Sequence, residues 1–209
     1  MEIQFYGANC ISVTVGGARL VIDDTIADMG GKSVTKSGDV ALYTRAHGAA
    51  PDGVKLVIDR AGEYEVSDVS VYGIQAKAHI DDDKQKTAVM YKLIAKDIRL
   101  LVAGHISSKL KESDLEAIGT IDVLVVPVGG NGYTLDPVGA MELIKEVEPK
   151  IVVPTHYADD KLSFEVPAQT LEQALQAIGS EPTRTSKLKL KHADLPTDGT
   201  FQVVVIEKN

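Results

Sequence analysis

This sequence of 209 residues lacks the features that disulfide bonds and membrane-spanning helices require. The chain contains one cysteine, Cys10, so no disulfide can form within it. Cys10 belongs to the apolar run CISVTV, which predicts ordinary burial in a core. No stretch of about 18 residues is apolar enough for a membrane-spanning helix, and the N-terminal sequence MEIQFYG lacks a basic segment followed by an apolar one. We therefore predict a soluble, cytoplasmic protein.

Positive charge is also scarce. The 22 Lys and Arg residues are outnumbered by 30 Asp and Glu residues, which gives a net charge of -8. The one short basic segment, KLKLKH near the C-terminus, alternates strictly and is more typical of a strand with one solvated face. Because phosphate binding needs clustered Lys and Arg side chains, we expect no nucleic acid partner, and no membrane partner either.

The composition, 44% hydrophobic and 25% charged, suits one globular α/β domain over residues 1–209. A helix capped by Ser113 and Glu116 should end at Gly119, and another should start near Pro167 and end at Gly179. Short apolar or alternating runs predict strands at 2–6, 10–15, 18–23, 40–44, 54–58, 63–66, 69–77, 87–94, 97–103, 123–128, 151–153, 186–191 and 201–206. This order favours two sheets packed face to face with helices outside.

Residues 121–157 predict a β-α-β unit. Asp136 occupies an N-cap position with Pro137 as the first helical residue, and Pro149 ends the helix. Both flanking strands are apolar throughout, so the sheet should be covered on both faces.

The ends of these two strands are the first candidate for a site. In open α/β sheets, ligands bind just beyond the carboxyl ends of the strands. Here one end carries Gly129, Gly130 and Gly132, and the other carries Thr155 and His156. The glycine-rich loop matches neither a P-loop nor a dinucleotide-binding fingerprint, so we expect it to form a tight turn near the pocket.

Several segments together resemble a known family. In chain order they are FYGANCISV followed by LVID, then DVALYT, AGEYEV, LLVAGHIS, IDVLVVPVGGNGYTLD and PKIVVPTHY. The pattern is similar to the metallo-β-lactamase-fold hydrolases, in particular a bacterial branch of predicted zinc-dependent hydrolases, over residues 3–165 or so. The resemblance implies a four-layer αββα sandwich of the α/β (α+β) class, with a site at one edge between the sheets.

The family's metal-binding loop, T/S-H-x-H-x-D-H, is degenerate in this chain. Residues 44–50 read TRAHGAA, so His47 is kept. Arg45 stands where the family has its first histidine, Ala49 replaces the aspartate and Ala50 replaces the last histidine.

The remaining ligand positions are mixed. The resemblance places the family's later histidine at His79 and its final histidine at His156. His105 replaces the aspartate that bridges two metals in the family. The early Gly-His-Ala/Ser-Cys segment has also lost its histidine and reads GANC at residues 7–10.

These replacements argue against a di-zinc hydrolase. A zinc site needs about three protein donors and an open position for water. Two methyl side chains supply no donor, and Arg45 places a fixed positive charge where a dication would bind. We therefore expect no resident cofactor, and zinc or another divalent metal only if the remaining histidines form a rearranged site.

Two interpretations of the four histidines stay open. His47, His79, His105 and His156 could hold a single metal, or they could be relics that hydrogen-bond to neighbouring groups, which we favour. His192 lies outside the family's motifs and is expected at the surface.

Arg45 also has two interpretations. It could bind a carboxylate or phosphate in the former metal cleft, or it could form a salt bridge with Asp23, Asp24 or Glu63, which we favour. Asp23 and Asp24 could support a histidine, although capping of a turn is the simpler role.

The acidic run at residues 81–83 is most simply a solvated hairpin tip, although it could attract a cation. Ser107, Ser108 and Thr155 lie near histidines in the pattern, but no acidic partner supports a nucleophilic triad.

Three functions follow from these observations. The first is a metallo-β-lactamase-fold protein that has lost its di-zinc site and binds an unknown small molecule or a partner. The second is a hydrolase of esters, lactones or phosphoesters that uses metal-bound water at a single-metal site. The third is a structural subunit that self-associates into a homo-oligomer.

Overall fold

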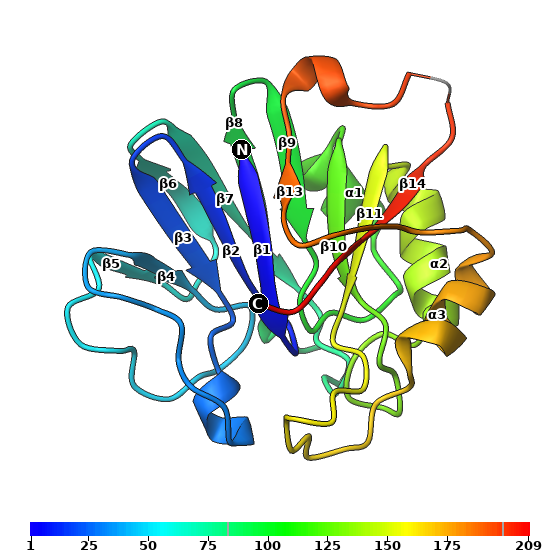
Figure 1. Ribbon diagram of the computed structural model, residues 1–209, viewed down its shortest axis with the longest axis horizontal. Coiled ribbons are helices and arrows are strands. Elements are labelled where there is room, and N and C mark those ends of the chain that lie inside the picture. The colour runs from blue at the N-terminus through cyan, green and yellow to red at the C-terminus, as the bar shows by residue number, and fades with distance from the viewer. Residues whose placement is uncertain (83, 198) are drawn as a thin grey trace.

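The computed structural model describes residues 1–82, 84–197 and 199–209. Within these residues the chain forms two β-sheets that face each other (Figure 1). The first sheet has the strand order β13-β1-β2-β3-β4-β5, and the second has the order β12-β14-β11-β10-β9-β8-β7-β6. The strands of the first sheet are β1 (Glu2–Gly7), β2 (Cys10–Val15), β3 (Ala18–Ile22), β4 (Val40–Leu42), β5 (Leu56–Ile58) and β13 (Leu188–Lys189).

The second sheet contains β6 (Gly62–Val66), β7 (Val69–Ala76), β8 (Ala88–Ala95), β9 (Ile98–Val102), β10 (Val123–Pro127), β11 (Ile151–Thr155), β12 (Thr183–Thr185) and β14 (Gln202–Ile206). The strands β9, β10, β11 and β14 run parallel, whereas β6 to β9 form an antiparallel meander. In the first sheet β3, β4 and β5 run parallel. Each sheet therefore contains a parallel region whose strands end at one common edge.

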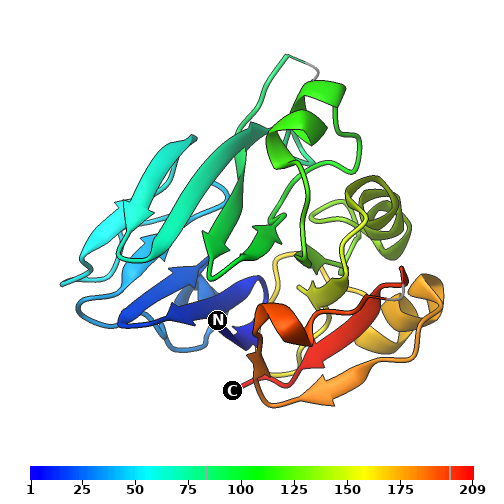
Figure 2. The same cartoon turned by 90° about the horizontal axis from the view of Figure 1, so that it is seen from above.

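The helices cover one sheet only. The described α-helices are α1 (Glu112–Ile118), α2 (Pro137–Val147) and α3 (Leu171–Ile178), and they lie outside the second sheet (Figure 2). One buried cluster fills the space between the sheets, and a second lies between the second sheet and the helices. Both clusters consist of the apolar side chains that alternation and helical periodicity place inward.

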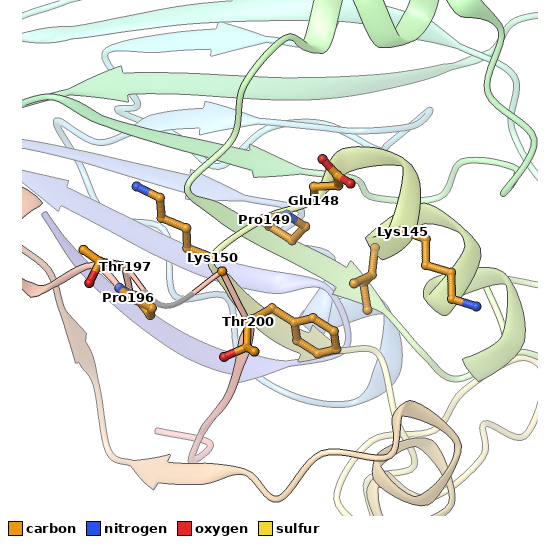
Figure 3. A pocket seen from close by; sticks show the side chains of 10 residues that line it. Lys145, Glu148, Pro149, Lys150, Pro196, Thr197 and Thr200 are labelled. Atoms are coloured by element: carbon orange, nitrogen blue, oxygen red, sulfur yellow. The ribbon is translucent and has the colours of Figure 1, made fainter.

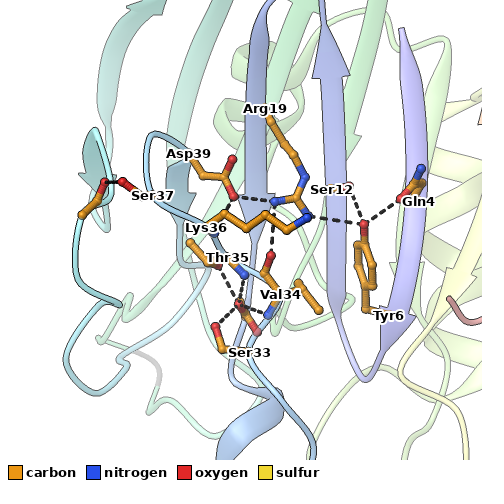
Figure 4. A network of polar contacts seen from close by, with 12 residues as sticks. Gln4, Tyr6, Ser12, Arg19, Ser33, Val34, Thr35, Lys36, Ser37 and Asp39 are labelled. Atoms are coloured by element: carbon orange, nitrogen blue, oxygen red, sulfur yellow. Dashed lines mark hydrogen bonds and ion pairs between the residues drawn. The ribbon is translucent and has the colours of Figure 1, made fainter.

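The outer face of the first sheet is covered differently. A short 3₁₀ helix, η1 (Ile26–Met29), and Leu162 pack on Cys10 and Val21 of that face. Beside this cluster, Arg19 donates to Asp39 and to the hydroxyl of Tyr6 (Figure 4). The fourth layer of the sandwich is thus made of loops and a single 3₁₀ turn on this side.

The sequence predicts the strands better than the helix starts. Asp136 caps α2 through a hydrogen bond from Gly139 N, as expected. The predicted cap of α1 is wrong: the helix begins one residue before Ser113, because the carboxylate of Asp114 accepts the backbone N–H of Lys111. The predicted start of α3 near Pro167 is also wrong, since Thr170 is the N-cap.

Residues just before α3 are instead used in loop pairing. Gln169 N donates to Gly129 O, and Ala158 N donates to Gln169 O, which holds this segment extended against the glycine-rich loop. Strand β12 was not predicted because its sequence, Thr-Arg-Thr, is polar and mostly exposed. Of the strand predicted at 186–191, only Leu188–Lys189 forms β13; Leu188 is buried and Lys189 exposed, in line with one solvated face.

No helix among the described residues combines the length and the apolar character that crossing a membrane would require.

A glycine sets the spacing between the two sheets at the edge where the parallel strands end. Gly104 follows β9 with φ +64, and a Cβ atom there would lie 2.4 Å from the side chain of Thr44. We expect Gly104→Ala to lower the free energy of unfolding by about 1–3 kcal/mol, because both the backbone conformation and the contact are strained.

Urea denaturation measures this loss. Gly179→Ala is the matched control, since Gly179 has a similar φ of +71 but a Cβ there meets nothing within 4 Å. Equal stability of the two variants would contradict the close packing of Gly104 on Thr44.

Candidate functional site

The candidate site lies at the edge where the parallel strands of both sheets end. β3 and β4 end there in the first sheet, and β9, β10 and β11 end there in the second. The residues that follow these ends include Asp23, Thr44, Arg45, His105, Gly129, Gly130 and His156. Parallel topology therefore brings together side chains that are far apart in the sequence, as the general rule for α/β sheets predicts.

Thr44 joins the two sheets at this edge. Its backbone N and its hydroxyl both donate to the carboxylate of Asp23, at 2.7 and 2.6 Å. Its carbonyl accepts from Val89 N of the second sheet at 2.8 Å. The same hydroxyl lies 3.3 Å from Nδ1 of His105. Thr44 is fully buried, so these contacts fix the relative position of Asp23 and His105.

Burial dominates the chemistry of Asp23. It raises the pKa of the carboxyl to about 6, although the two hydrogen bonds from Thr44 and the positive charge of Arg45 act in the opposite direction. Asp23 Oδ2 lies 3.9 Å from Nδ1 of His105. Asp23 thus supports His105 through Thr44, whereas Asp24 Oδ2 accepts four hydrogen bonds from the loop at 33–35, which is the expected capping role.

His105 and His156 form a buried pair whose ring centroids lie 5.6 Å apart, edge to face. Burial lowers the pKa of His105 well below its usual value, and the charge of Arg45 lowers it further. Burial also lowers the pKa of His156 to about 4. Both imidazoles are therefore neutral at pH 7, and Nδ1 of His156 is buried without a hydrogen-bond partner among the described residues.

Arg45 lies over an aromatic ring rather than beside a carboxylate. Its guanidinium carbon is 4.9 Å from the centroid of Tyr133, whose ring contacts His105 edge-on at 5.7 Å and His156 at 5.6 Å. Among the described residues Arg45 forms no ion pair, and its buried Nε has no hydrogen-bond partner. The salt bridge that we favoured from the sequence is therefore wrong.

The carboxylates offered for that salt bridge are used elsewhere. Both oxygens of Asp23 accept from Thr44, and Oδ2 of Asp24 accepts from the loop at 33–35, so these oxygens bond to other groups than Arg45. Glu63 lies on β6 and forms no ion pair with Arg45 in the part of the chain that the structure describes.

The four histidines of the sequence analysis divide into two locations. His79 is exposed, but its backbone N donates to His105 O at 3.2 Å, and its side chain lines the same cavity as Arg45 and His105. His47 instead stacks on Tyr43 with ring centroids 3.5 Å apart, and its Nε2 lies 3.7 Å from Asp59. The structure thus brings His79, His105 and His156 to the edge where the parallel strands end and turns His47 toward Tyr43 and Asp59.

The remaining candidates have structural partners. Thr155 donates to Asn9, and the backbone N of Gly130 donates to the Thr134 hydroxyl and to Leu135 O, which closes the glycine-rich turn. A Cβ at Gly129 would lie 2.0 Å from His156 O, so only glycine lets this loop approach β11.

Two further sequence expectations concern the acidic run and His192. Asp81 accepts hydrogen bonds from Ala78 N and from Thr87, which makes it a turn cap, while Asp83 of the same acidic run lies outside the described residues. His192 is exposed, as predicted for a surface residue, and its ring Nδ1 lies 3.0 Å from Asp97 O.

Two site residues were missed from the sequence. Tyr133 belongs to the motif GNGYTLD, and its place in a motif was a signal. Nothing in the sequence indicated that the guanidinium of Arg45 would lie over its ring. Phe164, whose ring lies 5.0 Å from that of His156, comes from an irregular loop that gives no periodic signal.

A cavity with a volume of about 850 Å³ lies elsewhere. It is found between the end of α2 and residues 196–197 and 199–201, at the amino end of β11 (Figure 3). Its charged side chains are Lys145, Glu148 and Lys150, and Lys150 is paired with Asp122 at 3.3 Å. Since parallel strands bind ligands at their carboxyl ends, the histidine edge is the better candidate.

Two facing sheets with a polar edge at their parallel strand ends, and helices outside, define the metallo-β-lactamase fold. The profile of the beta-lactamase superfamily domain matches residues 2–156, and the chain belongs to this family. A metal-dependent hydrolase of Lysinibacillus sphaericus is 26% identical over 197 residues, which cover 75% of this chain and 85% of the relative.

Solved structures agree with this assignment. A Thermotoga maritima protein, assigned as a zinc-dependent hydrolase of the metallo-β-lactamase superfamily, is 27% identical with a TM-score of 0.74 and covers 99% of this chain and 98% of its own. A protein from Parabacteroides distasonis, assigned as a metal-dependent hydrolase, shares the fold at 15% identity and a TM-score of 0.67, over 99% and 93% of the two chains.

The family's relatives are thus described as metal-dependent, but the donors of this chain do not fit a di-metal centre. In the residues that the structure describes, no group of three or more His, Cys, Asp or Glu side chains is placed to hold a metal ion. The positive charge of Arg45 lowers the pKa of both His105 and His156, so it lies close enough to repel a dication bound by either.

The low pKa of His156 makes stability depend on pH. Between the folded-state value of about 4 and the unfolded value of 6.5, the unfolded chain binds more protons at this residue, so stability falls as the pH is lowered through this window. Asp23 acts in the opposite direction, but it is common to the variants compared.

We expect His156→Gln to flatten this dependence by up to about 1.4 kcal/mol per pH unit. Urea denaturation at pH 4.5, 5.5 and 6.5 (about one-unit steps across the window) measures the slopes. His192→Gln, a change at an exposed histidine, should leave the wild-type slope unchanged. Parallel curves for His156→Gln and wild type would show that His156 titrates normally.

Proposed function

We propose that this member of the metallo-β-lactamase fold has lost the family's di-metal hydrolytic centre and binds a small molecule at the same edge of the sheets. The observation that carries the proposal is Arg45. A guanidinium that lies on Tyr133, close to His105 and His156, occupies the side of the cleft where the family's first histidine would hold a metal.

The surrounding donors support the same proposal. The loop after β4 offers Ala49 and Ala50 in place of two ligands, and His47 is turned toward Tyr43 and Asp59. The cleft itself is retained, because the contacts of Thr44 with both sheets do not depend on a metal. A shaped cleft with a largely apolar wall, a few polar groups and no metal-ligand set is suited to binding rather than to hydrolysis by metal-bound water.

The competing function is a hydrolase with a single metal. It is favoured by the names of the relatives and by the placement of His79, His105 and His156 at one edge. This function requires that an ion bind beside Arg45, which makes metal content the decisive measurement.

Elemental analysis of protein purified without chelator tests the proposal. We expect less than about 0.1 zinc, manganese or iron per chain, and no change in the thermal midpoint on addition of chelator. Stoichiometric metal that is lost in His156→Ala but kept in His192→Ala would overturn the proposal in favour of the single-metal hydrolase.

A gain-of-metal variant provides the positive control. Arg45→His combined with Ala49→Asp and Ala50→His restores the family's motif and removes the positive charge. We expect this triple variant to bind about one zinc ion per chain, because three donors are sufficient for a site. If wild type already binds as much zinc as the triple variant, Arg45 does not exclude the ion.

A further inference from the structure

Two cavities meet at the Arg45–Tyr133 pair, and their linings differ in charge. One, of about 300 Å³, is lined by Asp28 and Glu165 among others. The other, of about 160 Å³, contains no acidic side chain among the described residues that line it. Asp28 and Glu165 repel an anion from the larger cavity. The fixed positive charge of Arg45 therefore favours an anion in the smaller cavity.

The smaller cavity, which we call the Arg45 pocket, is lined by Arg45, Ala46, Ala78, His79, Ile80, Thr87, His105 and Tyr133. Most of its wall is therefore methyl, methylene or ring surface, and Arg45 provides its permanent charge. A volume of 160 Å³ corresponds to about five water molecules, which limits a ligand to roughly four to six non-hydrogen atoms.

Carboxylates near the Arg45 pocket form no ion pair with Arg45 among the described residues. Asp23 accepts two hydrogen bonds from Thr44, and Asp81 accepts hydrogen bonds from Ala78 and Thr87. The guanidinium keeps a buried Nε without a partner in the described part of the chain. The guanidinium is held on Tyr133 and lines the pocket without a carboxylate partner among the described residues, so its charge is available to an anion that enters.

The geometry points to a short-chain monocarboxylate as the ligand of the Arg45 pocket, with its carboxylate on the guanidinium of Arg45 and its apolar chain against Ala46, Ala78 and Ile80. This inference rests on the proposed binding function and names its ligand class. A carboxylate matches the planar fork of one arginine, whereas a phosphate has more acceptor oxygens than this largely apolar wall can satisfy.

Butyrate, butyramide and inorganic phosphate are the probes. Titrations at constant ionic strength, followed by NMR of the chelator-treated full chain, should give a Kd of about millimolar for butyrate. Butyrate should shift resonances of Arg45, His79, His105 and Tyr133 but not those of Lys145 at the distant cavity. This measurement needs no variant.

Two arginine variants then test whether Arg45 provides the positive charge that binds butyrate. Arg45→Gln should weaken butyrate binding at least about tenfold, which is the loss of one charge-assisted contact. Arg60→Gln is the matched control, since Arg60 is highly exposed and already paired with Asp59. Arg45→Gln should also not lower the thermal midpoint, whereas a salt-bridged arginine would do so when replaced.

Several results would overturn the inference. Equal binding of butyramide would show that charge plays no part, and tighter binding of phosphate would change the ligand class. An equal loss in Arg60→Gln would indicate nonspecific ion binding, and absence of binding by any probe would remove the site. None of these results affects the metal analysis. If the protein is free of metal but does not bind butyrate, the proposed function stands and only this inference fails.

Discussion

The edge of the sandwich depends on one buried arrangement, the carboxylate of Asp23 and the two donors of Thr44. A carboxylate buried to this degree is costly unless its oxygens are satisfied, and Thr44 supplies both a backbone and a side-chain donor. Because Thr44 also bonds Val89 and packs against Gly104, the same contacts fix the distance between the sheets. His105 and Arg45 flank this arrangement, so the same hydrogen bonds and packing determine where they lie.

This internal support explains how the cleft keeps its shape with few metal donors. In a metal site, the ion itself holds ligands from several strands together. Here hydrogen bonds perform that task, with Thr155 on Asn9 and His156 N on Ala8 O closing the far side. Arg45 and Tyr133 then fill part of the space between them, so the edge is packed by a cation and a ring.

The fold could be predicted from the sequence because its signals are local and redundant. Apolar runs such as 123–128, glycines at strand ends and the Asp136 cap each agree with the observed β-α-β unit. Helix starts were less predictable, since Asp114 and Thr170 compete with other capping residues within a few positions.

Side-chain direction at the site could not be predicted in the same way. The sequence places His105 and His156 at strand ends, and these ends meet at one edge of the sheet, but it does not show that His47 turns onto Tyr43 or that Arg45 lies on Tyr133. Those outcomes depend on which partners the tertiary structure offers, such as Asp23 being already occupied by Thr44. Spacing in a motif carries no such information.

The pairing of β1 with β13 has a consequence for biosynthesis. Glu2 and Ile3 pair with Lys189 and Leu188, so β1 leaves the ribosome long before its outer neighbour β13 is made. Until then β1 is an uncovered sheet edge with free backbone donors and acceptors, the kind of surface that recruits other chains. The short strand β13 later covers that edge and presents the exposed Lys189, a charge that discourages further strand addition once folding is complete.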